Sequence, residues 1–250
     1  MILTNKFNIP AVIYEAIEAD INDNPYEDLK RSGICFRTTE LLGPPLIRTL
    51  HKKFKDTKSL IVDASHYLAV QYGKMFHSLC EGVSTPELLY EYKVSRTFDY
   101  NGQKITLFGM LDEMEHLDNN VVQVTDNKTC LMSNLGYDKP EYDEQLNVYL
   151  HLIRPELSGD YFEFKLQLRY FIKDFTPSKK VNALARAANP YTKAKAEELP
   201  NASIYYKSVP VYTEDQIENI ILEHIADHIE TPERVCTTEE RWDTLPKTAV

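Results

Sequence analysis

Residues 94–128 have the sequence VSRTFDYNGQKITLFGMLDEMEHLDNNVVQVTDNK, which decides the fold class of this chain. Asn101-Gly102 separates two stretches of strand-like alternation, and this dipeptide suits a tight hairpin turn because both turn positions require a positive φ. We predict strands at 94–100 and 103–108, a third strand at about 108–116, a turn at 118–120 and a fourth strand at 121–127. Residues 88–128 are therefore expected to form an antiparallel meander.

Helical patterns flank this meander. Residues 64–81 and about 141–154 each repeat apolar side chains with the helical period, and the second stretch ends before Pro155. A strand is expected at about 161–175, short helices and loops at 178–200, a last helix at about 214–230, and helical pieces at 1–60, broken at Pro25 and at Gly43-Pro44-Pro45. This order predicts an α/β or α+β fold with a central mixed sheet flanked by helices.

The composition is that of a globular protein. The chain has 250 residues, 43% of them hydrophobic and 26% charged, which suits one domain or at most two small ones. Four cysteines lie far apart without a C-x-x-C pair, so we expect neither a disulfide framework nor a zinc knuckle, and a reducing cytoplasm as the location. We also expect no membrane span and no secretory leader, because long apolar runs are absent.

Acidic residues outnumber basic ones, with 38 Asp and Glu against 28 Lys and Arg and a formal net charge of −10. This sign argues against a protein that coats nucleic acid nonspecifically, because such proteins neutralise phosphates with basic side chains. A nucleic-acid enzyme stays open, since carboxylates that hold divalent cations add negative charge where the metals bind.

Two aspartates of the meander suggest a chemistry. Asp112 lies on the third expected strand and Asp126 at the end of the fourth, so pairing through the turn can bring them together. Close carboxylates repel unless a cation lies between them, and Mg²⁺ or Mn²⁺ suits such hard oxygen ligands. Lys128 shares a strand face with Asp126, where an ammonium can stabilise the charge that develops in phosphodiester hydrolysis. Taken alone, the Asp126-Asn127-Lys128 triplet also fits a surface salt bridge.

Polar residues on the two flanking helices add to this set. Gln145 and Tyr149 fall, four residues apart, inside the apolar arc of the helix at 141–154, so the amide needs a buried partner. Considered without the rest of the sequence, the pair is explained as a core glutamine with its hydrogen bonds satisfied, beside a core tyrosine. His77 shares one helical stripe with Gly73 and Glu81, although a lone helical histidine is more often a packing residue.

Two other groups have simpler explanations. His224 and His228 have a spacing that can bind a metal, but both lie in the apolar stripe of the last helix and are interpreted as core or helix-packing residues. Tyr205, Tyr206 and Trp242 could stack on bases, although aromatic residues near a chain end are more often packing residues.

In this order and spacing the motifs resemble the PD-(D/E)XK nuclease superfamily, and its RecB-type exonuclease branch in particular. The motifs are Gly73-Lys-Met-Phe-His77-Ser-Leu-Cys-Glu81, Gly109-Met-Leu-Asp112, Asp126-Asn-Lys128-Thr129 and Gln145-Leu-Asn-Val-Tyr149. They cover a core of about residues 64–175 within a single expected domain of 1–250. The helical flanks are similar to those of stand-alone, phage-type members.

The resemblance implies a restriction-endonuclease-like core and a Mg²⁺- or Mn²⁺-dependent deoxyribonuclease of exonuclease type, acting in DNA replication, recombination or repair. The implied ligands of one or two metal ions are His77, Asp112, Asp126 and the backbone carbonyl of Asn127. Lys128 would position and activate the attacking water, Gln145 and Tyr149 would line the site and contact the DNA strand, and Glu81 would support the metal ligands.

DNA is the expected substrate, and a recombination or replication protein is the expected partner. No iron–sulfur cluster is expected, because only Cys236 lies downstream of the core, where the cluster-containing branches carry three cysteines. Two alternatives stay open. One is a catalytically weak nuclease-fold binding or assembly module, which the acidic net charge favours and Lys128 disfavours. The other is a structure-specific endonuclease or an RNase, since such a metal site acts on the phosphate and ignores sugar and base.

Overall fold

The computed structural model describes most of the chain. The described residues are 2–22, 26, 29, 32–54, 61–68, 70–71, 73–75, 85, 87–117, 120–135, 139–157, 163–186, 193, 197 and 199–234. The implied site residues His77 and Glu81 lie outside them, as do Cys236 and Trp242.

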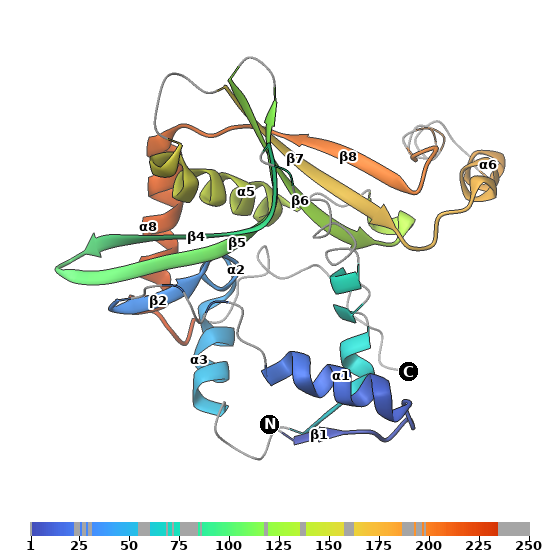
Figure 1. The fold of residues 1–250 in the computed structure, drawn as a ribbon, viewed down its shortest axis with the longest axis horizontal. Helices are drawn as coiled ribbons and strands as arrows, with labels where there is room; N and C mark the ends of the chain where they lie inside the picture. The colour runs from blue at the N-terminus through green and yellow to red at the C-terminus, as the bar shows by residue number, and fades with distance from the viewer. Residues whose placement is uncertain are drawn as a thin grey trace.

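A mixed β-sheet forms the centre of the molecule (Figure 1). Its strands follow the order β2, β5, β6, β7, β8, with β4 paired to β5. Their bounds are β2 Ile34–Arg37, β4 Leu88–Tyr100, β5 Gln103–Leu117, β6 Val121–Cys130, β7 Glu163–Ile172 and β8 Ile204–Val209. The β2–β5 and β6–β7 pairs are parallel and the other pairs are antiparallel. The predicted α/β fold with a central mixed sheet and flanking helices is confirmed.

The hairpin at Asn101-Gly102 is confirmed, but the number of strands in the meander is not. Asn101 has a φ of 50° and Gly102 a φ of 76°, as a tight hairpin turn requires. The stretches predicted as separate strands at 103–108 and 108–116 form one strand, β5, of 15 residues. Gly109, in the middle of that strand, does not end it. It makes room there for a helix side chain, since an added β-carbon would lie 2.5 Å from Tyr149 Cε1.

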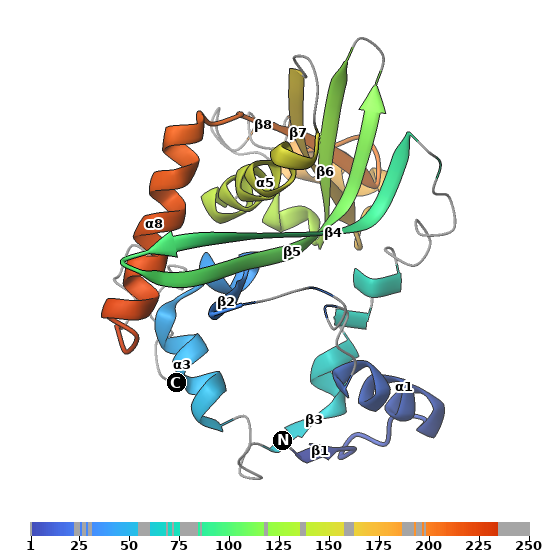
Figure 2. The ribbon, with the colours of Figure 1, turned by 60° about the vertical axis from the view of Figure 1, so that its left-hand side comes forward.

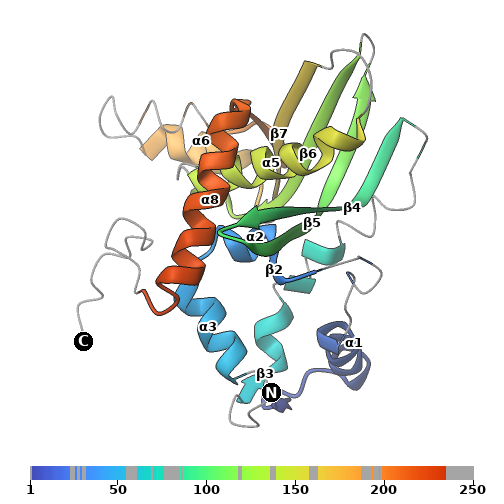
Figure 3. The ribbon, with the colours of Figure 1, turned by 90° about the vertical axis from the view of Figure 1, so that its left-hand side faces the viewer.

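Helices α2 (Thr38–Leu41), α5 (Pro140–Ile153) and α8 (Glu214–Glu230) pack against one another, and α2 and α5 contact the sheet directly. Figure 3 shows α5 and α8 on the same face of the sheet. Proline occupies the first turn of α5, where its missing N–H is not needed. Thr213 and Gln216 form a capping box that begins α8. The helices predicted at about 141–154 and 214–230 are confirmed.

The first part of the chain differs from the prediction of helical pieces alone. Besides α1 (Ala11–Asn22) and α3 (Pro45–Phe54), it contains β1 (Ile2–Thr4) and β2. β1 pairs in parallel with β3 (Ile61–Asp63), and β2 pairs in parallel with β5. Strands of three or four residues show no usable alternation, and these obtain their hydrogen bonds from partners about 60 or more positions away.

A small second core holds this N-terminal part together. Ile9, Ile17 and Ala64 form it, separately from the main cluster between the sheet and α5. Figure 2 shows β1, β3 and α1 set apart from the main sheet. The expectation of a single domain over 1–250 stays a prediction.

The remaining elements are short. The helix predicted at 64–81 begins as a 3₁₀ turn, η1 (Ala64–Tyr67), and the described residues from 68 to 75 are helical. η2 (Met132–Asn134) and η3 (Arg154–Glu156) flank α5, and α6 (Pro177–Arg186) follows β7. β8, at 204–209, was not predicted. Within the described ranges, no helix combines the length and the apolar character needed to span a membrane.

Candidate functional site

The candidate site lies where β5 and β6 separate. Their antiparallel pairing runs from Leu117↔Val121 to Glu113↔Thr125. At the next position Asp112 Oδ2 accepts a hydrogen bond of 2.7 Å from the backbone N–H of Asn127. The aspartate side chain thus binds a strand N–H just beyond the last ladder pair. This places Asp112 beside the Asp126–Lys128 segment, the neighbourhood that pairing through the 118–120 turn predicts.

We call the place where β5 and β6 separate, with Asp112, Asp126 and Lys128, the fork. Two neighbouring carboxylates dominate its electrostatics. Burial raises the pKa of Asp112 well above its ordinary value, and the charge of Asp126 raises that pKa further. The Asn127 N–H and the Lys128 ammonium act in the opposite direction without cancelling the effect. A bound cation would relieve this repulsion, because it favours the ionised form of both carboxylates.

Asp126, Lys128 and Gln145 form a closed set of contacts. Lys128 Nζ lies 2.7 Å from Asp126 Oδ2. Gln145 Nε2 donates to Asp126 Oδ1 at 3.1 Å, and Lys128 Nζ donates to Gln145 Oε1 at 3.3 Å. Burial disfavours the charged form of Lys128, but the charge and hydrogen bond of Asp126, together with the charge of Asp112, outweigh burial and raise the pKa of Lys128. The lysine is therefore an ammonium at neutral pH.

Tyr149 of α5 lies next to this set of contacts. Gln145 Nε2 also lies within hydrogen-bond distance of the Tyr149 hydroxyl, at 3.4 Å. Burial, followed by the charges of Asp126 and Asp112, raises the pKa of Tyr149, so the phenol stays protonated. The partner that the buried Gln145 amide was expected to need is therefore a neighbouring carboxylate, and Gln145 and Tyr149 lie with Asp126 as one group.

A buried ion pair supports the site from the opposite face of the sheet. Arg169 donates to both carboxylate oxygens of Glu113, at 2.6 and 2.9 Å, and to Asn127 Oδ1 at 3.3 Å. Glu113 is only 3% exposed. These contacts join β5, β6 and β7 directly behind Asp126. Neither residue was predicted from the sequence, because β5 carries Asp112, Glu113 and Glu115 close together and no local pattern shows which of them is buried.

Glu91 is a third residue that was not predicted from the sequence. It lies in β4 with a φ of 50°, between the pairs Tyr90↔Glu113 and Tyr92↔Leu111. A positive φ is costly for a residue with a β-carbon and is often found near functional sites. The Glu91 charge raises the pKa of Asp112, so a third carboxylate acts on the fork. A positive φ at a glutamate inside a strand could not be read from the sequence.

The residues at the fork fit a divalent metal. Asp112, Asp126 and the backbone carbonyl of Asn127 offer hard oxygen ligands of the type that Mg²⁺ and Mn²⁺ prefer. Asp126 Oδ2 is buried and, apart from its ion pair with Lys128, has no hydrogen-bond partner among the described residues. In the described ranges no three His, Cys, Asp or Glu side chains are gathered closely enough to hold a metal. The implied ligand His77 and its neighbour Glu81 lie outside those ranges.

The histidines of α8 are packing residues, as interpreted from the sequence. His228 Nε2 donates to the Leu41 carbonyl at 2.9 Å, and its ring centroid lies 5.1 Å from that of Phe36. His224 Nε2 lies 3.8 Å from Glu144 Oε2 on α5. The two imidazoles therefore contact different elements.

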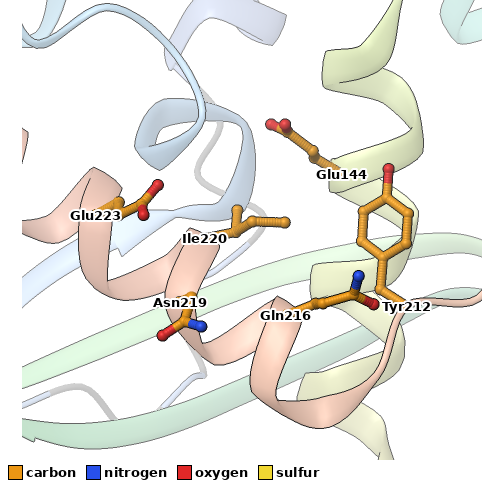
Figure 4. A pocket seen from close by; sticks show the side chains of 6 residues that line it. All are labelled: Glu144, Tyr212, Gln216, Asn219, Ile220 and Glu223. Carbon is orange, nitrogen blue, oxygen red and sulfur yellow. The ribbon is translucent and has the colours of Figure 1, made fainter.

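An open hollow between α5 and α8 shares no residue with the fork (Figure 4). The side chains that line it are Glu144, Tyr212, Gln216, Asn219, Ile220 and Glu223. The Gln216 side-chain oxygen is already an acceptor in the capping box. Its described lining has two carboxylates and no basic residue, and so offers no set comparable to that of the fork.

Comparison with known proteins gives a structural likeness and no family. No protein-family model matches the chain, and no curated protein matches it. Among solved structures, the chain is similar to the crystal structure of SSO0001, with a TM-score of 0.56 and 16% sequence identity. The likeness covers 88% of this chain and 84% of that chain. At this level of identity it shows a shared fold alone.

Proposed function

We propose that this chain is a metal-dependent nuclease that hydrolyses phosphodiester bonds in DNA, with exonuclease action as the first expectation. The observation that carries the proposal is the gathering of Asp112, Asp126 and Lys128 at the β5–β6 fork, with Gln145 and Tyr149 in the same set of contacts. The order and spacing of these residues, which resemble those of PD-(D/E)XK nucleases, support it.

The metal-binding part of the proposal rests on oxygen ligands. Asp112, Asp126 and the Asn127 carbonyl would hold Mg²⁺ or Mn²⁺, with His77 as a further ligand. When bound, such an ion polarises a phosphoryl oxygen and lowers the pKa of a coordinated water. No iron–sulfur cluster is part of the proposal.

Lys128 has a defined role in this proposal. As an ammonium it contacts Asp126 and Gln145 and has a further N–H donor available for a phosphate oxygen or the attacking water. Its raised pKa makes it a donor that stabilises developing negative charge, and not the general base. The Tyr142 ring, with its centroid 4.5 Å from Nζ, adds a cation–π contact that keeps the ammonium in place.

Gln145 and Tyr149 are positioning residues. Gln145 donates a hydrogen bond to Asp126 Oδ1, and the other carboxylate oxygen, Oδ2, is directed toward Lys128. Tyr149 stays protonated and keeps a hydroxyl that can donate to a phosphate oxygen. The two side chains would hold the carboxylate and the strand in register for in-line attack.

A cleavage assay tests the proposal. End-labelled linear DNA and closed circular DNA are incubated with the chain in Mg²⁺, Mn²⁺ or EDTA. The assay compares three proteins, which are the unaltered chain, Lys128→Ala and Lys179→Ala. Lys179 forms a lysine–aspartate pair with Asp174, outside the fork, so its loss controls for the removal of one ion-paired lysine. We expect metal-dependent loss of linear DNA that Lys128→Ala abolishes and Lys179→Ala retains.

Other outcomes separate the alternatives. Nicking of the circle would identify an endonuclease, and cleavage of RNA alone would identify an RNase. Calorimetric titration with Mn²⁺ gives a readout besides activity, and Asp126→Asn should weaken that binding. Mn²⁺ binding without cleavage of any nucleic acid would contradict the nuclease proposal and favour a binding or assembly module.

A further inference from the structure

A row of aromatic side chains leads from Lys128 to the edge of the sheet. From this row we infer that Tyr170 and Tyr205 bind the unpaired bases of a single-stranded nucleic acid whose backbone passes the Asp126 site. The inference rests on the proposed nuclease function and adds to it a substrate class, the single strand. We call Tyr142, Tyr170 and Tyr205 the tyrosine row.

The pairing register of three neighbouring strands places this row. Lys128 of β6 is the partner of Tyr170 of β7, and Tyr170 is the partner of Tyr205 of β8. Residues paired in this way point to the same face of a sheet, and neighbouring strands lie ~4.8 Å apart. Tyr205 therefore lies about 10 Å from the Lys128 backbone. The rings of Tyr170 and Tyr205 are tilted at 38°, with centroids 6.2 Å apart.

The row lies on the face that carries α5 and the proposed site. Lys207, two residues from Tyr205, points to the same face and forms an ion pair with Asp143 of α5 at 3.0 Å. Tyr142 comes from the first turn of α5, and both Lys128 Nζ and Lys139 Nζ lie over its ring, at 4.5 and 4.8 Å from the centroid. The row thus begins between two ammonium groups next to Asp126.

Exposure increases toward the outer end of the row. Tyr142 and Tyr170 are partly buried, and Tyr205 is 36% exposed. Among the described strands, β8 pairs only with β7 and so forms an edge of the sheet. Figure 1 shows β8 extending beyond α5 toward α6. Tyr142 and Tyr170 pack against the main hydrophobic core, whereas Tyr205 at the edge keeps the accessible surface that stacking on a base requires.

Unpaired bases are the ligand that fits this arrangement. Aromatic side chains along a positively charged path bind single strands, because every base has a face that can stack. In a duplex, the base faces are already stacked on one another and are not available to side chains. The ammonium groups of Lys128 and Lys139 lie where the backbone phosphates would pass, and stacking on Tyr170 and Tyr205 would hold the bases farther from the fork.

A binding experiment with the full chain in EDTA tests the inference without requiring cleavage. Fluorescence anisotropy compares a short oligodeoxythymidylate, an abasic oligomer of the same length and a blunt duplex. Tyr205→Ala should bind the oligothymidylate roughly tenfold more weakly, and Tyr205→Phe should bind like the unaltered chain. The matched control is Tyr206→Ala. Tyr206 is 53% exposed on the opposite face of β8, where Arg169 lies over its ring.

Each outcome decides the inference. If Tyr205→Ala weakens binding of the oligothymidylate but not of the abasic oligomer, the result supports base stacking. This holds even if the chain cleaves nothing and the nuclease proposal fails. Equal loss for Tyr206→Ala, or equal loss on the abasic oligomer, would overturn it. Unchanged binding by Tyr205→Ala together with intact cleavage would also overturn it while the nuclease proposal stands. If Tyr205→Ala changes only the sedimentation coefficient, the edge pairs with a second copy of the chain and the inference is wrong.

Discussion

Gly109 of β5 and Tyr149 of α5 are in direct contact at the candidate site. A β-carbon at position 109 would lie 2.5 Å from Tyr149 Cε1 and 3.0 Å from Thr38 Oγ1. The first distance is too short for any real contact, so a side chain at 109 must displace the tyrosine ring or the strand. The absence of a side chain in β5 thus allows Tyr149 to lie beside Gln145 and Asp126.

Gly109→Ala should therefore reduce both stability and cleavage. Overpacking of this kind costs about 1–3 kcal/mol, and a shift of Tyr149 removes its contact with Gln145. We expect at least about a tenfold loss of kcat, because small displacements of positioning groups are costly. Urea denaturation and the cleavage assay measure the two effects. The control is Gly102→Ala, at a turn position with a φ of 76°, which should lose stability and keep kcat. Equal kcat for the two variants would contradict the role of Tyr149.

Gln145→Ala should lower activity without unfolding the chain. The substitution removes the donor to Asp126 Oδ1 and the acceptor of Lys128 Nζ. Loss of a side chain that orients a ligand typically costs about 10–100-fold in metal affinity or activity. Mn²⁺ titration and cleavage rates measure this loss. Gln71→Ala is the matched control, since Gln71 donates to Asp20 at 3.0 Å away from the site. An equal effect of both variants would rule out a specific role for Gln145.

Arg169→Ala should destabilise the chain strongly. It leaves the Glu113 carboxylate buried without its partner, and breaking a buried ion pair in this way costs about 3–5 kcal/mol. Chemical denaturation of the variant measures the loss. The more exposed pair Arg234–Asp227, at 2.7 Å, is the comparison, because pairs near the surface contribute at most about 1 kcal/mol. A double variant with Glu113→Gln should recover part of the stability, and no recovery would show that Arg169 acts through packing.

Asp63 should make the N-terminal β1–β3 pair sensitive to acid. Desolvation opposes its charge, but hydrogen bonds from the backbone N–H groups of Lys6 and Ser65, helped by side-chain hydrogen bonds from Ser65 and Thr4, outweigh it and lower the pKa of Asp63 to about 2. A lowered pKa stabilises the folded state above the ordinary value of 3.8. This stabilisation is lost as the pH falls through the folded pKa.

Hydrogen exchange measures this local effect. The Lys6 and Ser65 amides should be protected above pH 4 and lose protection progressively toward about pH 2. In Asp63→Asn the protection should be weaker throughout and independent of pH in that window. A pH-independent difference between the two proteins would show that the Asp63 charge does not hold these amides.

The candidate site was predictable from sequence to the extent that its residues follow one another at regular spacings. Asp126 and Lys128 share a strand face, and Gln145 and Tyr149 share a helix face, because the periods of strand and helix are local properties. The turn at Asn101-Gly102 was predictable for the same reason. Glu113, Arg169 and Glu91 were not, because the contacts of Arg169 and the positive φ of Glu91 depend on how distant strands are joined.

The sequence by itself determined the hairpin, the two core helices α5 and α8, the mixed α/β class and the shared faces of the site residues, since side-chain period and turn chemistry act over a few residues. Only the tertiary structure decided where the short strands β1, β2 and β8 pair, where β5 and β6 separate, and that Tyr170 and Tyr205 align with Lys128. These features depend on hydrogen bonds and packing between segments far apart in the chain, and no local pattern encodes them.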